Sequence, residues 1–189
     1  RLGVTTGGSL AMGGVGAARS TPGGGVLQPG VGEQGEEGGR PAFASGGGEV
    51  GIAEQNAIGI AAGLATTGLR PYVCAYAPFI TARSMEQVRN DIAYANQRVV
   101  IGAAASGISL GVAGGTHHAV EDLALMRSLP NMTVIVPADV NEAYAATLAT
   151  LEIDGPVYLR LGGRGEEPPV GDPGAPFRLG KAVQLRAGD

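Results

Sequence analysis

The chain has 189 residues, a length that fits one domain, or one domain with a short extension, and that can bury a core without disulfide bonds. Its 17 acidic residues outnumber 13 basic ones, so no electrostatic footprint for nucleic acid or an anionic membrane is present. The single cysteine, Cys74, lies in an apolar run, which favours a small core residue and indicates a reducing, cytoplasmic location. The longest uncharged segment, residues 99–115, is too weakly apolar for a membrane span.

The first 48 residues are the least determined part of the chain. The first fifty residues hold about half of the 34 glycines, and glycine disfavours regular structure. We interpret this stretch as a first strand–helix unit, with "VLQPGVGEQGEEGG" (26–39) as the candidate for its strand and turn.

From Glu54 onward, helical and strand-like patterns alternate. Helices are predicted at about 54–67, 84–96, 119–129 and 141–152, and strands at 71–77, 98–106, 132–138 and 156–161. Short apolar strands that alternate with helices predict an α/β fold, with a parallel sheet covered by helices on both faces.

The pattern changes near the end of the chain. A Pro/Gly-rich run, "GEEPPVGDPGAP", follows Arg164, and "FRLGKAVQLRAGD" resembles a first strand that is then cut off. We therefore expect one domain over residues 1–165, then a linker and the start of a truncated C-terminal domain over 166–189.

Glu54 stands at the start of an almost uncharged helix. Apolar residues follow it at three- and four-residue steps, and Gly68 ends the helix. A carboxylate in this position has a plain structural explanation, since it interacts favourably with the helix dipole by about 0.3–1 kcal/mol. The residues alone leave that explanation and a functional one open.

Four ordered blocks resemble the pyrimidine-binding domain of the transketolase family of thiamine diphosphate enzymes. They are "GIAEQNAIGIAAGLATTGLRPYV", "FITARSMEQVRND", "GGTHHAVEDLALMRSLPNMTVIVPAD" and "GPVYLRLGGR", which together cover about residues 49–165. The chain resembles most the separate C-terminal subunit of split transketolases. The resemblance implies that thiamine diphosphate performs the carbanion chemistry while the protein activates it.

The resemblance assigns cofactor contacts to three residues. Glu54 matches the glutamate that hydrogen-bonds the pyrimidine nitrogen N1′ and so helps to activate the thiazolium carbon, a role served by a carboxyl group in apolar surroundings. Tyr76 and Phe79 match the aromatic platform under the pyrimidine ring. Ordinary core packing is the alternative for both aromatic residues.

Three further residues are candidates for substrate binding. His117 matches the catalytic histidine that faces the oxygen atoms of the substrate, and His118 occupies the next position with an open role. A metal pair is disfavoured, because no cysteine or carboxylate completes a ligand set at the usual spacing. Arg164 aligns with an arginine that holds a substrate phosphate, although an extra glycine blurs the alignment and a solvated surface arginine is the alternative.

The chain departs from the family pattern in three places. Ala113 stands where many members carry an acidic residue that contacts a sugar hydroxyl, which puts ordinary sugar specificity in question. Gly30 stands where the first strand usually ends in an aspartate, with Glu33 nearby. The Gly-Asp-Gly motif that holds the diphosphate and its metal ion is absent from these residues. A partner subunit must therefore supply that half of the site, with Mg²⁺ or a similar ion, in a two-fold heterotetramer.

The resemblance implies transfer of a two-carbon ketol unit from a ketose donor to an aldehyde acceptor. Three alternatives stay open: a 1-deoxyxylulose-5-phosphate synthase-like enzyme, the β subunit of a 2-oxo acid dehydrogenase, and a non-catalytic scaffold. Glu54 and His117 argue against the scaffold, whereas Ala113 and the glycine-rich start leave it open.

Overall fold

A six-stranded sheet forms the centre of the molecule, in the strand order β2-β1-β3-β4-β6-β5. The structure is a computed structural model that describes residues 14–18, 47–163, 168–170, 177–181, 184 and 186–188. The strands are β1 (Gly14–Ala18), β2 (Gly47–Glu49), β3 (Arg70–Tyr76), β4 (Val100–Ala104), β5 (Thr133–Ile135) and β6 (Val157–Arg160).

Four of these strands form a parallel sheet. Strand β3 pairs with β4, β4 with β6, and β6 with β5, all in parallel. The predicted α/β class is therefore confirmed. Strand β1 adds an antiparallel edge, since it pairs antiparallel with both β2 and β3. The sequence had placed the first strand at 26–39, a segment that lies outside the described residues.

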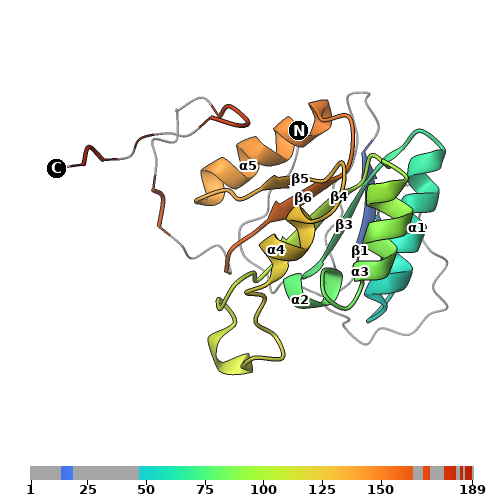
Figure 1. Ribbon diagram of the computed structural model, residues 1–189, viewed down its shortest axis with the longest axis horizontal. Helices are drawn as coiled ribbons and strands as arrows, with labels where there is room; N and C mark the ends of the chain where they lie inside the picture. Colours follow the sequence, from blue (N-terminus) through green and yellow to red (C-terminus); the bar gives the residue numbers. More distant parts are fainter. Residues whose placement is uncertain are drawn as a thin grey trace.

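Helices cover both faces of this sheet, as predicted (Figure 1). The α-helices are α1 (Glu54–Thr66), α2 (Ala77–Ile80), α3 (Met85–Gln87), α4 (Asp122–Arg127) and α5 (Val140–Ala149). A π-helix, η1 (Val88–Tyr94), continues α3, and two 3₁₀ turns are η2 (Gly111–Ala113) and η3 (Thr150–Glu152). Helices α1, α2, η1 and α4 pack on one face, while α5 lies on the other.

Alternation along the strands explains the two-sided core. On β4, Ile101 points into the cluster under α1 and η1, whereas Val100 points into the cluster under α5. On β6, Tyr158 and Val157 divide in the same way. Successive side chains of a strand point to opposite faces, so strands that are buried on both sides read as continuous apolar runs.

Two predicted helices differ from the observed ones. The segment predicted as a helix at 84–96 contains a short α-helix and then η1, whose last turn is closed by a hydrogen bond from Gln97 N to Ile92 O of 2.9 Å. Such i→i+5 bonds define a π-helix. Helix α4 begins at Asp122 rather than at 119, because the backbone of Ala119 pairs with Gly107 instead.

The carboxyl ends of β3, β4 and β6 meet at one edge of the sheet. Strand β3 leads there into α2, and β4 leads into the long connection to α4 that Figure 1 shows projecting from the body of the domain. Ligands of parallel α/β sheets bind outside this edge. The candidate residues after β3 and β4 therefore lie on the side of the fold that suits a site.

Candidate functional site

Glu54 is the first residue of α1 and is almost completely buried, with 2% of its surface exposed. Its Oε2 atom lies 3.2 Å from Nη1 of Arg83. Its Oε1 atom is buried without a hydrogen-bond partner among the described residues. A buried acceptor without a partner costs free energy, so such an atom in a folded protein requires an explanation.

The aromatic residues lie directly after β3. Tyr76 ends the strand, and Pro78 at the start of α2 favours the helical turn that presents Phe79. The two rings are 6.4 Å apart, centroid to centroid. The guanidinium carbon of Arg83 lies 4.2 Å from the centroid of the Phe79 ring, which is a cation–π distance.

His117 approaches the same cluster from the opposite side. Its ring packs edge-on against Phe79, with centroids 5.2 Å apart and an interplanar angle of 78°. Its Nδ1 atom lies 2.9 Å from the hydroxyl of Thr116. The structure thus joins Glu54, Phe79 and His117 through Arg83, a residue that sequence reasoning did not single out.

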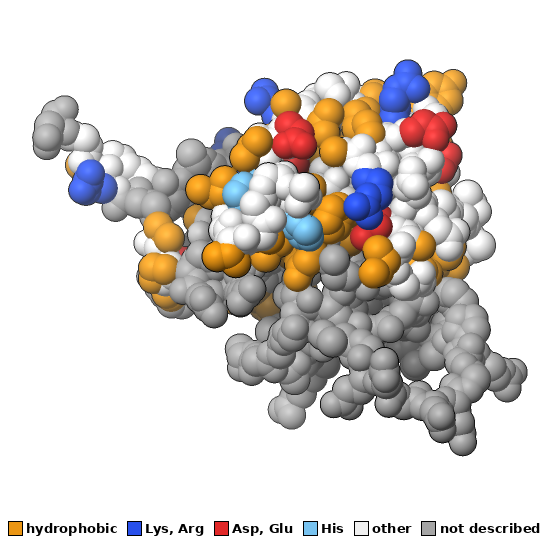
Figure 2. Space-filling view, turned by 90° about the horizontal axis from the view of Figure 1, so that it is seen from below, with side chains coloured by type: hydrophobic (Ala, Val, Ile, Leu, Met, Phe, Trp, Pro, Cys, Tyr) orange, Lys and Arg blue, Asp and Glu red, His pale blue; other side chains and the backbone are white. Residues whose placement is uncertain are grey.

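His118 belongs to the same loop but has a different partner. Its Nε2 atom lies 3.2 Å from the carbonyl oxygen of Gly111, and a carbonyl can only accept, so Nε2 carries the proton in this contact. Figure 2 shows both histidines on one face of the molecule, among hydrophobic side chains. Of the two, His117 is the one that contacts the Phe79 ring.

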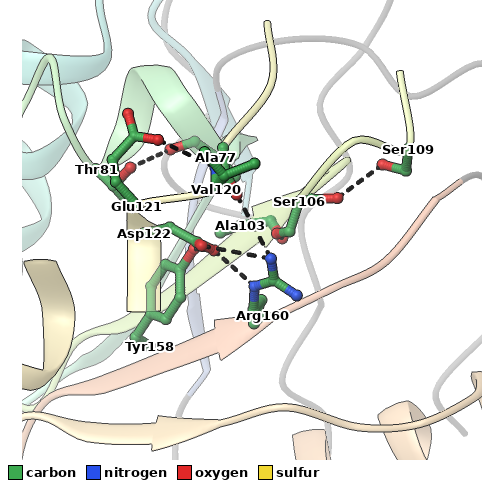
Figure 3. Close-up of polar contacts among 11 residues, drawn as sticks. Ala77, Thr81, Ala103, Ser106, Ser109, Val120, Glu121, Asp122, Tyr158 and Arg160 are labelled. Carbon is green, nitrogen blue, oxygen red and sulfur yellow. Dashed lines mark hydrogen bonds and ion pairs between the residues drawn. The ribbon is translucent and has the colours of Figure 1, made fainter. Parts of the chain in front are cut away.

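A buried ion pair holds the base of the loop that carries the histidines (Figure 3). Arg160, at the end of β6, donates from Nε to Oδ2 of Asp122 at 2.7 Å, and Asp122 is fully buried at the start of α4. The hydroxyl of Tyr158 donates to the same oxygen, also at 2.7 Å. Burial and this hydrogen bond raise the pKa of Tyr158, so the phenol stays a donor.

The backbone of the loop closes beside this pair. Gly107 and Ala119 exchange two backbone hydrogen bonds of 2.9 and 2.8 Å. Gly107 has a φ of +66°, and a Cβ there would lie 3.3 Å from Nη2 of Arg160. Both constraints favour glycine. Asp122 and Arg160 are 38 residues apart, and neither the spacing nor the composition signalled that they pair.

The remaining predicted residues fall into two groups. Arg164 lies outside the described residues. Cys74 is paired with Gly102 on β4, where a Cβ would come within 2.9 Å of the sulfur, and burial raises the pKa of its thiol to about 11. That environment agrees with a packing role rather than a nucleophilic one.

Two searches of the described part of the chain returned nothing. No group of three His, Cys, Asp or Glu side chains in these residues could hold a metal ion. No helix in them is long and apolar enough to cross a membrane.

The arrangement suits a flat heteroaromatic ligand. The unpartnered Oε1 of Glu54 can exchange a hydrogen bond with a ring nitrogen, and Phe79 offers an apolar ring within the same cluster. These are the features that the pyrimidine ring of thiamine diphosphate requires from a protein, so the residues present fit that cofactor.

Comparisons with known proteins support the resemblance noted in the sequence. The family model described as the pyrimidine-binding domain of transketolase matches residues 28–164. The chain is 39% identical over 140 residues to one subunit of the apulose-4-phosphate transketolase of Phocaeicola vulgatus, covering 74% of this chain and 45% of that protein. It is 40% identical over 142 residues to 1-deoxy-D-xylulose-5-phosphate synthase of Lysinibacillus sphaericus, covering 74% of this chain and 22% of that protein.

A solved structure agrees with these relatives. A split-gene transketolase, described as an inactive beta4 tetramer, matches with a TM-score of 0.65 at 44% identity, over 74% of this chain and 44% of that one. The predicted resemblance to a subunit of split transketolases, and the predicted fold type, are confirmed. The chain spans less than half the length of these split-transketolase relatives.

Proposed function

Because the chain belongs to the transketolase pyrimidine-binding domain family, we propose that it is the pyrimidine-binding half of a thiamine diphosphate-dependent, transketolase-like enzyme. The proposed reaction transfers a two-carbon ketol unit from a ketose donor to an aldehyde acceptor. One observation carries the proposal, namely the buried, unpartnered Oε1 of Glu54 in a cluster with Phe79. When bound, the cofactor supplies the acidic thiazolium carbon and the electron sink for carbanion chemistry.

Each residue of the cluster has a distinct task in this proposal. Glu54 hydrogen-bonds the N1′ atom of the pyrimidine ring, and Phe79, together with Tyr76, supports the ring. His117 binds the oxygen atoms of the substrate and exchanges protons with them near neutral pH. Arg164 holds a substrate phosphate, and His118 supports the loop through Gly111.

The proposal requires a second chain. The 189 residues lack the Gly-Asp-Gly motif that binds the diphosphate and its divalent ion in this family, so the partner subunit would hold both, in a two-fold heterotetramer. Exposed apolar side chains beside the site support such a contact: Ile108, Val112 and Val120 are 69%, 106% and 72% exposed. The related beta4 tetramer is described as inactive, which agrees with a subunit that needs its partner.

Glu54→Gln tests the proposal directly. The amide keeps the shape of the side chain but cannot give and take a proton as a carboxyl group can, so deuterium exchange at the thiazolium carbon should slow by about two orders of magnitude or more. The matched control is Glu152→Gln, which changes an exposed glutamate in η3 and should leave exchange unchanged. Equal exchange in Glu54→Gln and native protein would reduce Glu54 to a helix-dipole residue.

A second candidate function is 1-deoxyxylulose-5-phosphate synthesis. The 40% identity to an enzyme of that name favours it over the dehydrogenase-like alternative. The two functions differ in their donor, because the synthase takes pyruvate whereas a transketolase takes a ketose. Assay of the reconstituted pair with each donor, and release of carbon dioxide from pyruvate, separates them.

A further inference from the structure

Arg83 is the one charged side chain that contacts both Glu54 and Phe79 among the described residues. We propose that Arg83 is a positioning residue, which holds Oε2 of Glu54 so that Oε1 stays available to the pyrimidine ring. The proposal rests on the proposed function, because it assumes that a pyrimidine ring binds beside Glu54.

The backbone under Arg83 is fixed by α2. The amide of Arg83 donates to the carbonyl of Pro78 at 3.2 Å, and the hydroxyl of Ser84 donates to the carbonyl of Phe79 at 2.8 Å. Thr81, in between, donates its hydroxyl to the carbonyl of Ala77 at 2.6 Å. The guanidinium therefore starts from a constrained position, and less side-chain freedom remains to be lost when it binds Glu54.

Two contacts then fix the guanidinium itself. Nη1 lies 3.2 Å from Oε2 of Glu54, while the planar group lies over the Phe79 ring at 4.2 Å from its centroid. The side chain of Arg83 is 48% exposed and that of Glu54 is 1% exposed, so the arginine reaches inward from the surface to a buried carboxyl group. An arginine can make both contacts at once because its charge is spread over a plane.

The two oxygens of Glu54 consequently have different partners. Arg83 binds Oε2, and no described residue binds Oε1. A glutamate held at one oxygen cannot rotate freely about its last torsion, which is otherwise broad. The free oxygen is thus kept in one direction, in a cluster that also contains the Phe79 platform.

The test measures affinity for thiamine diphosphate in the chain reconstituted with its partner subunit. We expect Arg83→Met to weaken binding by about tenfold to a hundredfold, as for loss of a charge-assisted contact. Arg83→Lys keeps the charge without the plane, so it should recover part of the loss. Arg89→Met is the matched control, since Arg89 is exposed on η1 and contacts only Asn90 among the described residues.

A double variant shows whether Arg83 acts through Glu54. In the Glu54→Gln background, Arg83→Met should cause little further loss of cofactor affinity, because the carboxylate that it positions is already gone. Circular dichroism of each variant separates weaker binding from unfolding. If Arg83→Met does not fold, the Arg83→Lys variant carries the same comparison.

The outcomes separate this inference from the proposed function. Native affinity in both Arg83→Met and Arg83→Lys, tighter binding in Arg83→Met, or losses that add fully to those of Glu54→Gln would overturn the positioning role while the proposed function stands. Absence of cofactor binding in the native pair would overturn both.

Discussion

Removal of Arg160 should destabilise the chain far more than removal of an exposed arginine. Asp122, its partner, is fully buried, and without Arg160 it keeps only the hydroxyl of Tyr158. Breaking a buried pair from one side costs about 3–5 kcal/mol, because an uncompensated charge remains in the interior. For a chain of this size, each kcal/mol corresponds to about 2–4 °C, so Arg160→Met should lower Tm by about 6–20 °C.

Thermal and urea unfolding of the purified chain, followed by circular dichroism, measure this change. The matched control is Arg98→Met, because Arg98 pairs with Asp154 at 3.3 Å while both side chains are largely exposed. That variant should stay within about 0.5 kcal/mol of the native chain. Adding Asp122→Asn to Arg160→Met should restore part of the stability, since the amide removes the buried charge. Similar losses in Arg160→Met and Arg98→Met would refute the reasoning.

Three further predictions concern reactivity, cofactor and donor. Cys74, with a thiol pKa of about 11, should have about one thiolate in a thousand at pH 8, so a thiol reagent should label the folded chain very slowly and the urea-unfolded chain quickly. The isolated chain should bind thiamine diphosphate weakly or not at all by calorimetry, and tight magnesium-dependent binding without a partner would contradict the split site. Ala113 lies exposed in η2, and His118 bonds Gly111 rather than replacing an acid, so the native enzyme should discriminate poorly against deoxy donors. Ala113→Asp should raise kcat/KM for the hydroxylated donor relative to its deoxy analogue, and unchanged strong native discrimination would contradict this interpretation.

The sequence predicted the parts of the fold that depend on local patterns. The alternation of helices and strands after Glu54 follows from side-chain periodicity, and α1 begins at Glu54 as expected. The π-helix η1 was missed because its buried residues, Val88 and Ile92, also fit an ordinary helix. The pairing of glycine-rich β1 with β3 was missed because glycine carries no strand signal.

Contacts between distant residues were the other limit. Glu54 and Phe79 were identified by resemblance, but their connection through Arg83 depends on how α1 and α2 pack, which local periodicity does not encode. Asp122 and Arg160 meet only because β6 lies beside β4 in the sheet. The roles of Glu54 and His117 remain predictions, because the geometry fits them without testing them.

The two halves of the cluster rest on different supports. Glu54, Arg83 and Phe79 are carried by α1, α2 and the segment after α2, which pack on the main core. His117 is carried by a long loop whose base is closed by the Gly107–Ala119 bridge and, beneath it, the Asp122–Arg160 pair. Loosening that base should therefore disturb His117 before it disturbs Glu54. A variant such as Arg160→Met, assayed below its Tm in the reconstituted enzyme, should raise KM for substrate while affinity for the cofactor changes little.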